Sequence, residues 1–177
     1  MDSYISALLD FRTTYSDRII IRTTGEPAEY LMENFGFSQS GDRVYLRGAE
    51  KFLAQYAPAL KYDTYLDYSP SPAPRGKIDE GYIACIFDHF GCYKIKVINA
   101  KNYPSIVFAC TNNGVNGVIS DWAGKKYNQQ ITLGVADIKR IYDRISDHLL
   151  IKLDSFDLLH CACWERFNLH FAEEFNK

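Results

Sequence analysis

The chain has 177 residues, 47% of them hydrophobic and 24% charged, and its 20 basic and 22 acidic residues give a formal charge of −2. This composition is typical of a folded globular protein and excludes a disordered chain. No apolar run approaches the roughly 18 residues of a membrane span. Residues 1–4 lack the basic start of a secretory signal, so we expect neither export nor a membrane partner.

The first part of the chain is predicted to alternate between helices and strands. Apolar periodicity and turn residues place these elements at 3–15 (helix), 18–22 (strand), 26–34 (helix), 43–46 (strand) and 49–56 (helix). Pro27 fits the first turn of the second helix, where a missing backbone N–H is harmless. Gly36 fits the left-handed position that ends this helix.

A proline-rich segment over 69–76 is the clearest linker in the sequence. Its prolines recur at every second position, which favours an extended spacer. We therefore expect a single domain over 1–177, divided into subdomains 1–68 and 77–177 if linker 69–76 separates them. No internal repeat of roughly 20 to 50 residues is visible, which sets solenoid architectures aside.

The apolar pattern changes to a period of two between residues 82 and 133, which predicts an antiparallel meander. Its strands are expected at 82–87, 92–98, 105–111, 118–119 and 127–133, with a hairpin turn at 88–91 and Asn-Gly turns at 113–114 and 116–117. Two helices, at 136–149 and 156–175, complete the chain. The expected fold class is α+β: a central antiparallel sheet over about 82–133, packed by the N-terminal α/β elements and two C-terminal helices.

Strong catalytic motifs are missing from the sequence, which contains no G-x-G-x-x-G, H-E-x-x-H, C-x-x-C or G-x-S-x-G pattern. His160 and Cys163 share one helical sector, but aromatic residues border it, so we interpret them as core residues and not as metal ligands. Cys85, His89 and Cys92 surround the expected hairpin and are interpreted as ordinary strand and turn residues. We thus expect no catalytic residue, no metal and no cofactor.

The cysteine count and the charge distribution indicate the setting and the class of partner. Five cysteines leave one unpaired in any full disulfide scheme, which favours reduced thiols in a bacterial cytoplasm. Basic and acidic residues number 8 and 10 over residues 1–75, and 12 and 12 over residues 76–177. Neither part is basic overall, so a nucleic-acid partner is not favoured.

Tyrosine is the most informative residue type, with 13 in the chain. Tyr62, Tyr65 and Tyr68 cluster with Asp63 and Asp67 just before the linker. Tyrosine rings are enriched at protein interfaces, and carboxylates attract basic partners. We therefore predict that these five residues bind another protein of basic character. Packing of the same rings against the domain is the competing interpretation.

The sequence thus favours a non-catalytic protein-binding module, of the kind represented by inhibitors and by immunity proteins that neutralise a toxin. The alternative is a small enzyme with a dispersed Cys/His/Asp site. Its candidate polar groups are Asp88, His89, Cys92, Asp121 and Arg22. The oligomeric state and the identity of the partner do not follow from the sequence.

Overall fold

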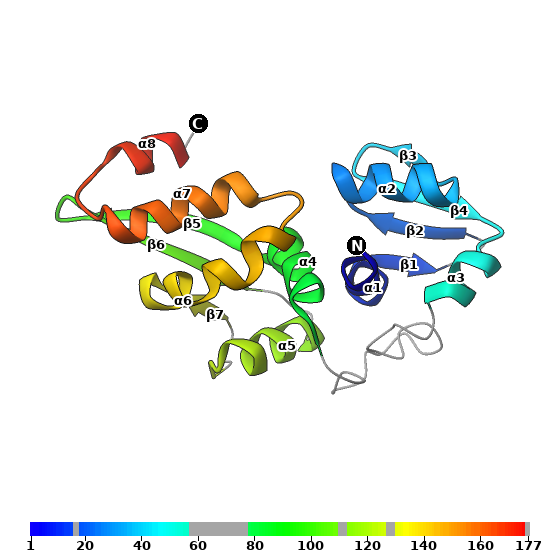
Figure 1. Cartoon of the computed structure of the whole chain (residues 1–177), viewed down its shortest axis with the longest axis horizontal. Coiled ribbons are helices and arrows are strands. Elements are labelled where there is room, and N and C mark those ends of the chain that lie inside the picture. The colour runs from blue at the N-terminus through cyan, green and yellow to red at the C-terminus, as the bar shows by residue number, and fades with distance from the viewer. Residues whose placement is uncertain (16–17, 57–77, 110–112, 127–129, 176–177) are drawn as a thin grey trace. The chain divides into compact units, whose positions relative to one another are not determined.

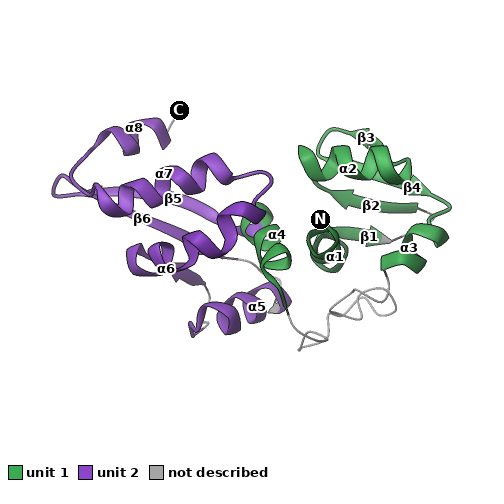
Figure 2. Ribbon diagram, in the orientation of Figure 1, with its two compact units in different colours: residues 1–89 green, residues 90–177 purple. Residues whose placement is uncertain are grey.

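The computed structural model describes residues 1–15, 18–56, 78–109, 113–126 and 130–175, and the chain forms two compact units, 1–89 and 90–177 (Figure 2). Each unit combines helices with an antiparallel sheet, so the predicted α+β class is confirmed. The linker at 69–76 lies outside the described residues, and the division into subdomains 1–68 and 77–177 stays a prediction. No helix within the described ranges is long and apolar enough to cross a membrane.

Unit 1 is built on a four-stranded antiparallel sheet in the order β1-β2-β4-β3 (Figure 1). Its elements in chain order are α1 (Asp2–Phe11), β1 (Thr13–Tyr15), β2 (Arg18–Arg22), α2 (Glu26–Phe35), β3 (Ser38–Ser40), β4 (Arg43–Arg47), α3 (Glu50–Tyr56) and α4 (Glu80–Phe90), whose last residue falls in unit 2. The predicted strand at 18–22 is confirmed. Gly36 ends α2 with φ 73° and ψ 26°, the expected left-handed conformation.

One face of the unit 1 sheet is buried against α1 and α2. Ile19 and Ile21 of β2 and Val44 of β4 are at most 3% exposed and pack in the same core as Leu8 of α1 and Leu31 of α2. Successive strand side chains point to opposite faces, so the residues between these positions lie on the other side of the sheet.

Unit 2 is built on a three-stranded antiparallel sheet in the order β5-β6-β7. Its elements are β5 (Cys92–Ile98), β6 (Lys101–Phe108), α5 (Asn113–Ala123), β7 (Ile131–Leu133), α6 (Val135–Ile145), the short 3-10 helix η2 (Ser146–His148), α7 (Leu153–Trp164) and α8 (His170–Phe175). Helices α6 and α7 pack on the sheet and bury Ile138, Ile141, Phe156 and Leu159. The predicted strand at 92–98 is confirmed.

The prediction of a strand at 82–87 is wrong, because these residues belong to α4. Every side chain from Tyr82 to Phe87 is buried, and a continuous apolar run fits a buried helix as well as a buried strand. The Asp79 carboxylate accepts a hydrogen bond from the Tyr82 backbone N–H at 3.0 Å, which caps the helix. The hairpin predicted at 88–91 is therefore replaced by a helix end, and the single meander by two separate sheets.

Two further predictions are corrected in unit 2. Residues 113–123 form α5 instead of turns and a short strand, because Val115, Val118 and Ile119 bury an apolar face at helical spacing. The helix predicted at 156–175 is interrupted between α7 and α8. Asn102 of β6 donates hydrogen bonds to the carbonyls of Arg166 and Asn168, which fixes the intervening segment against the sheet.

Helices α1 and α4 carry the same pattern of residue types, 78 positions apart. Each begins with Tyr-Ile, continues with two small and two large apolar residues, and ends with Asp: YISALLD over 4–10 and YIACIFD over 82–88. Each helix is followed by an antiparallel hairpin and another helix. The chain therefore contains an internal duplication, whose spacing exceeds the roughly 20 to 50 residues of solenoid repeats.

Candidate functional site

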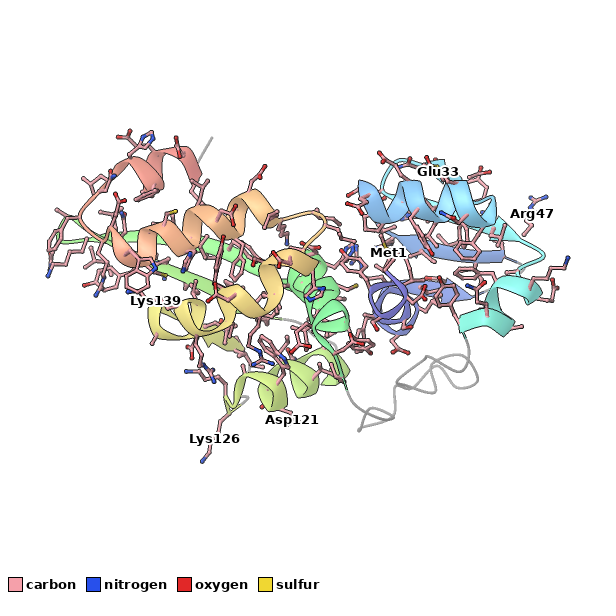
Figure 3. All side chains as sticks on the ribbon, in the orientation of Figure 1. Met1, Glu33, Arg47, Asp121, Lys126 and Lys139 are labelled. Carbon is pink, nitrogen blue, oxygen red and sulfur yellow. The ribbon has the colours of Figure 1, made fainter. Side chains whose placement is uncertain are left out.

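The side of the unit 1 sheet that faces away from α1 and α2 carries a cluster of arginines. Strand alternation assigns residues to this side, because Ile19, Ile21 and Val44 point into the core. The residues on it, here called the arginine face, are Arg18, Ile20 and Arg22 of β2 and Arg43, Tyr45 and Arg47 of β4. Arg47 extends outward from the end of β4 in Figure 3.

The arginines of this face lie directly opposite one another across the two central strands. The register pairs Arg18 with Arg47 and Arg22 with Arg43, and Ile20 with Tyr45 between them. Like charges in directly opposed strand positions destabilise a sheet. Two such pairs therefore concentrate positive charge on this side of the sheet.

A hollow of about 280 Å³ opens on the arginine face. Its lining residues are Arg18, Ile20, Ser40, Arg43 and Tyr45. The guanidinium carbon of Arg18 lies 5.3 Å from the centre of the Tyr45 ring, within the range of a cation–π contact. The Nε atom of Arg43 lies 3.8 Å from a carboxylate oxygen of Asp42. The Tyr45 ring thus supports the Arg18 guanidinium at the hollow, and Asp42 lies within ion-pair distance of Arg43.

The side of the unit 2 sheet that faces away from α6 and α7 is also basic. The core-facing residues of β6 are Asn102, Pro104, Ile106 and Phe108, which are all buried. The opposite side, here called the lysine face, is formed by Cys92, Lys94, Lys96 and Ile98 of β5, Lys101, Tyr103, Ser105 and Val107 of β6 and Thr132 of β7. A hollow of about 360 Å³ on this side is lined by residues that include Lys94, Lys96, Tyr103 and Ser105.

Charge is segregated between the sheets and the helices. Among the described residues, the strands contain four arginines, three lysines and no acidic side chain, whereas the acidic residues lie on helices and connecting segments. Glu33 on α2 is one example (Figure 3). Basic residues near the helices meet local acids: the Lys125 ammonium lies 2.9 Å from Asp137, and Arg140 lies 3.6 Å from it.

This segregation explains why charge counts along the chain were misleading. A net charge counted over residues 1–75 or over residues 76–177 combines the acidic residues of the helices with the basic residues of the strands, so each total is near zero. The two faces are nevertheless positive, because a partner that approaches the open side of a sheet meets the strand residues first. The signal was present in the sequence as strand segments that contain Arg or Lys but no Asp or Glu.

The five residues predicted to bind a protein partner lie outside the described residues. These are Tyr62, Asp63, Tyr65, Asp67 and Tyr68. Their assignment as a binding surface is untested. Of the tyrosines in the described part, Tyr4, Tyr56 and Tyr82 are at most 2% exposed and belong to the core.

The cysteine and histidine candidates of the first cluster do not form a reactive pair. Cys85 is buried in α4, and its burial raises the pKa of the thiol well above its ordinary value, which opposes formation of a nucleophilic thiolate. Cys92 is exposed on β5. The two cysteines are therefore not hairpin neighbours. His89 lies with Nε2 3.5 Å from both the Tyr4 hydroxyl and the Thr23 hydroxyl.

The second cluster has a packing role. The His160 ring stacks on Tyr142 with ring centres 3.7 Å apart, and its Nε2 accepts a hydrogen bond from the Trp164 indole at 3.1 Å. Cys163 is 1% exposed, and burial raises the pKa of its thiol to about 11. These contacts agree with the interpretation of His160 and Cys163 as packed residues of α7.

The polar groups named for a dispersed enzyme site are spread over different elements. Asp88 is buried in α4, where it accepts a hydrogen bond from Tyr4, and Arg22 is exposed on the arginine face. Cys92 lies on β5 and Asp121 is exposed on α5. In the ranges that the structure describes, no three His, Cys, Asp or Glu side chains gather as ligands for a metal ion.

The fold is similar to that of a DNA-bound enzyme of known structure. The crystal structure of the meganuclease I-SmaMI bound to uncleaveable DNA with a TTGT central four matches with a TM-score of 0.62 and 11% sequence identity, over 99% of this chain and 94% of that chain. No family model matches the chain. No curated protein matches it in sequence. The likeness to the meganuclease establishes a shared fold.

This comparison overturns the functional prediction made from the sequence. The prediction of a protein-binding module of inhibitor or immunity type is overturned, because the fold is similar to that of a meganuclease crystallised on DNA. The expectation of a protein partner, with nucleic acid not favoured, is corrected by the same finding. The physical reason for the error is the charge segregation described above.

Proposed function

We propose that the protein binds double-stranded DNA through the arginine face and the lysine face. The observation that carries this proposal is the presence of seven basic and no acidic side chains on the described strands of the two sheets. Neutralisation of phosphates by Lys and Arg supplies most of the affinity of DNA-binding proteins. The fold shared with a DNA-bound meganuclease supports the same conclusion.

Duplex DNA fits these faces better than a single strand does. Single-strand binding relies on several aromatic rings on which successive bases stack. Each face carries one tyrosine ring, Tyr45 or Tyr103, among its basic and hydroxyl side chains. Strands can enter a groove of a duplex, where basic side chains reach phosphates and polar ones reach base edges. The proposal concerns binding alone, since nothing in the described part supports a cleavage step.

The proposal is tested by fluorescence anisotropy with a labelled random-sequence duplex at low salt. Two variants remove two charges each from one face: R22Q/R47Q from the arginine face and K94Q/K96Q from the lysine face. Each should raise the Kd at least about tenfold, because each loses two phosphate contacts. The matched control K51Q/K126Q removes two exposed lysines outside the faces and should bind as the wild type does.

Two results would contradict the proposal. The first is an absence of duplex binding by the folded wild-type protein at low ionic strength. The second is an equal loss of affinity in the control and the face variants, which would indicate an unspecific charge effect. A stronger affinity for a single strand of the same sequence would replace duplex by single-stranded DNA as the partner.

A cytoplasmic setting is retained as part of the proposal. Cys85, Cys92, Cys161 and Cys163 are free thiols, which supports a reducing compartment. Duplex DNA is present in the same compartment of a bacterial cell. Secretion of the native protein into the medium or the periplasm would contradict this assignment.

A further inference from the structure

We propose that Arg18 and Arg43 select guanine in the bound duplex, whereas the lysine face attracts phosphates without base preference. This inference rests on the proposed DNA binding and adds a division of labour between the two faces. Base preference belongs to unit 1, and sequence-independent attraction belongs to unit 2.

The chemistry of the two faces differs in the identity of the cation. All four basic strand residues of unit 1 are arginines, and all three of unit 2 are lysines. The planar guanidinium presents two parallel N–H donors, which match the O6 and N7 acceptors of guanine in the major groove. The lysine ammonium is a compact charge on a flexible stem, so it follows phosphates with little demand on direction.

Geometry distinguishes Arg18 and Arg43 from the other two arginines. Both line the hollow of the arginine face together with Ser40, whereas Arg22 and Arg47 are not part of that lining. Tyr45 lies under the Arg18 guanidinium and Asp42 lies beside that of Arg43. A side chain that is already oriented loses less conformational entropy when it binds a base, which favours selective contacts.

On the lysine face, the one comparable contact of a lysine among the described residues is that of Lys101, whose ammonium lies 5.0 Å from the centre of the Phe167 ring; Lys101 does not line the hollow of that face. The register places Lys94 opposite Ser105 and Lys96 opposite Tyr103, so hydroxyl groups separate the charges. Arg166, which lies outside the sheet, is occupied by structural contacts: its Nε donates to the Asn102 carbonyl at 3.4 Å, and its guanidinium carbon lies 4.7 Å from the centre of the Tyr103 ring.

The test begins with selection of preferred sites from a random duplex library by the wild-type protein. The selected duplex and a version with its enriched guanines replaced are then compared in competition binding. R18K/R43K should reduce the preference for the selected duplex by at least about 5- to 150-fold, because this is the range of one good arginine–guanine contact and the variant removes two. The salt dependence should change little, because both charges are kept.

R22K/R47K provides the matched comparison, since it makes the same chemical change on the same face. Its preference for guanine should equal that of the wild type. Either of two results would overturn the inference while DNA binding stands: wild-type binding without enriched guanines, or an unchanged preference in R18K/R43K. If the wild type binds no duplex at all, the proposed function fails first and this inference fails with it.

Discussion

Tyr82 donates a buried hydrogen bond of 2.6 Å from its hydroxyl to Oδ2 of Asp10. The reverse pair is also present, because the Tyr4 hydroxyl donates to Oδ2 of Asp88 at 2.8 Å. All four side chains are at most 6% exposed. Tyr and Asp are the first and last residues of the pattern repeated in α1 and α4, so the duplicated sequence produces a reciprocal contact that fixes one helix against the other within unit 1.

The two reciprocal Tyr–Asp hydrogen bonds should contribute measurably to the free energy of unfolding. Tyr4→Phe and Tyr82→Phe each keep the ring and remove the buried hydrogen bond to the carboxylate, so each should lower the free energy of unfolding by about 1–3 kcal/mol. Tyr4→Phe also removes the 3.5 Å contact of the hydroxyl with His89 Nε2. Urea titration followed by circular dichroism measures this change. Tyr103→Phe is the control, because Tyr103 is 36% exposed, and it should change stability by less than about 0.5 kcal/mol. Wild-type stability in both Y4F and Y82F would contradict the account.

Removal of one facing arginine should stabilise the free protein and weaken DNA binding. Arg47 lies directly opposite Arg18, and relief of that repulsion in Arg47→Gln should raise the unfolding free energy by about 0.2–1 kcal/mol at low salt. The gain should shrink at 1 M salt, where charges are screened within about 3 Å. A lower stability of R47Q than of the wild type, measured in the same low-salt urea titration, is the opposing result.

DNA should protect one cysteine from alkylation. Cys92 is exposed on the lysine face, whereas Cys161 is exposed on α7, which packs against the other side of the unit 2 sheet. Maleimide labelling followed by peptide mapping should detect modification of both Cys92 and Cys161 in the free protein. With duplex present, Cys161 should react at the same rate as in the free protein, whereas Cys92 should react more slowly. Buried Cys163, whose pKa burial raises to about 11, should stay unlabelled until the protein unfolds. Equal labelling of Cys92 with and without DNA would place the DNA elsewhere.

Tyr142 should make stability depend on pH in the alkaline range. Its hydrogen bond to Asp157, at 2.7 Å, and its partial burial raise the pKa of the phenol from its ordinary value of 10.0 to about 12. Because the folded pKa is the higher one, the contribution is complete below pH 10 and is lost as the pH rises towards 12. Tyr142→Phe should therefore be about 1 kcal/mol less stable than the wild type at pH 8.

The alkaline prediction is checked by the difference between two urea titrations. The gap between wild type and Y142F should narrow steadily between pH 10 and 12. Stacking on His160 is retained by phenylalanine, so the difference reports mainly the hydroxyl. A difference in unfolding free energy that stays constant through this pH range would show that the hydrogen bond to Asp157 does not raise the pKa of Tyr142 in the folded state.

Local signals in the sequence were sufficient for much of the fold. The run of three isoleucines at 19–21, between two arginines, predicted β2, and Pro27 and Gly36 marked the two ends of α2. The sequence pattern failed to predict the element type where a segment is buried on all sides, because such a segment shows no alternation of apolar and polar residues. Residues 82–87 are apolar throughout, and such a run does not distinguish a helix from a strand. In α5, long-range packing of Val115 and Ile119 outweighed the local turn preference of Asn and Gly.

The candidate site depends on where the arginines lie in the paired strands, which the net charge of a segment does not show. Arg18 and Arg22 flank β2, and Arg43 and Arg47 flank β4, so each strand begins and ends with a cation. Their juxtaposition requires the antiparallel register of β2 with β4, which no single segment specifies. The functional prediction was placed on the tyrosine cluster at 62–68 because its residues are neighbours in the sequence. The basic residues of the sheet faces become neighbours only when the strands pair.

The salt dependence of duplex binding tests the central claim most directly. If five to seven of the strand cations contact phosphates, a plot of log Kobs against log salt concentration should have a slope of about −4.5 to −6, and R22Q/R47Q should reduce its magnitude by about 2. A slope near zero, or a slope that R22Q/R47Q and K94Q/K96Q leave unchanged, would show that these two faces do not hold the DNA.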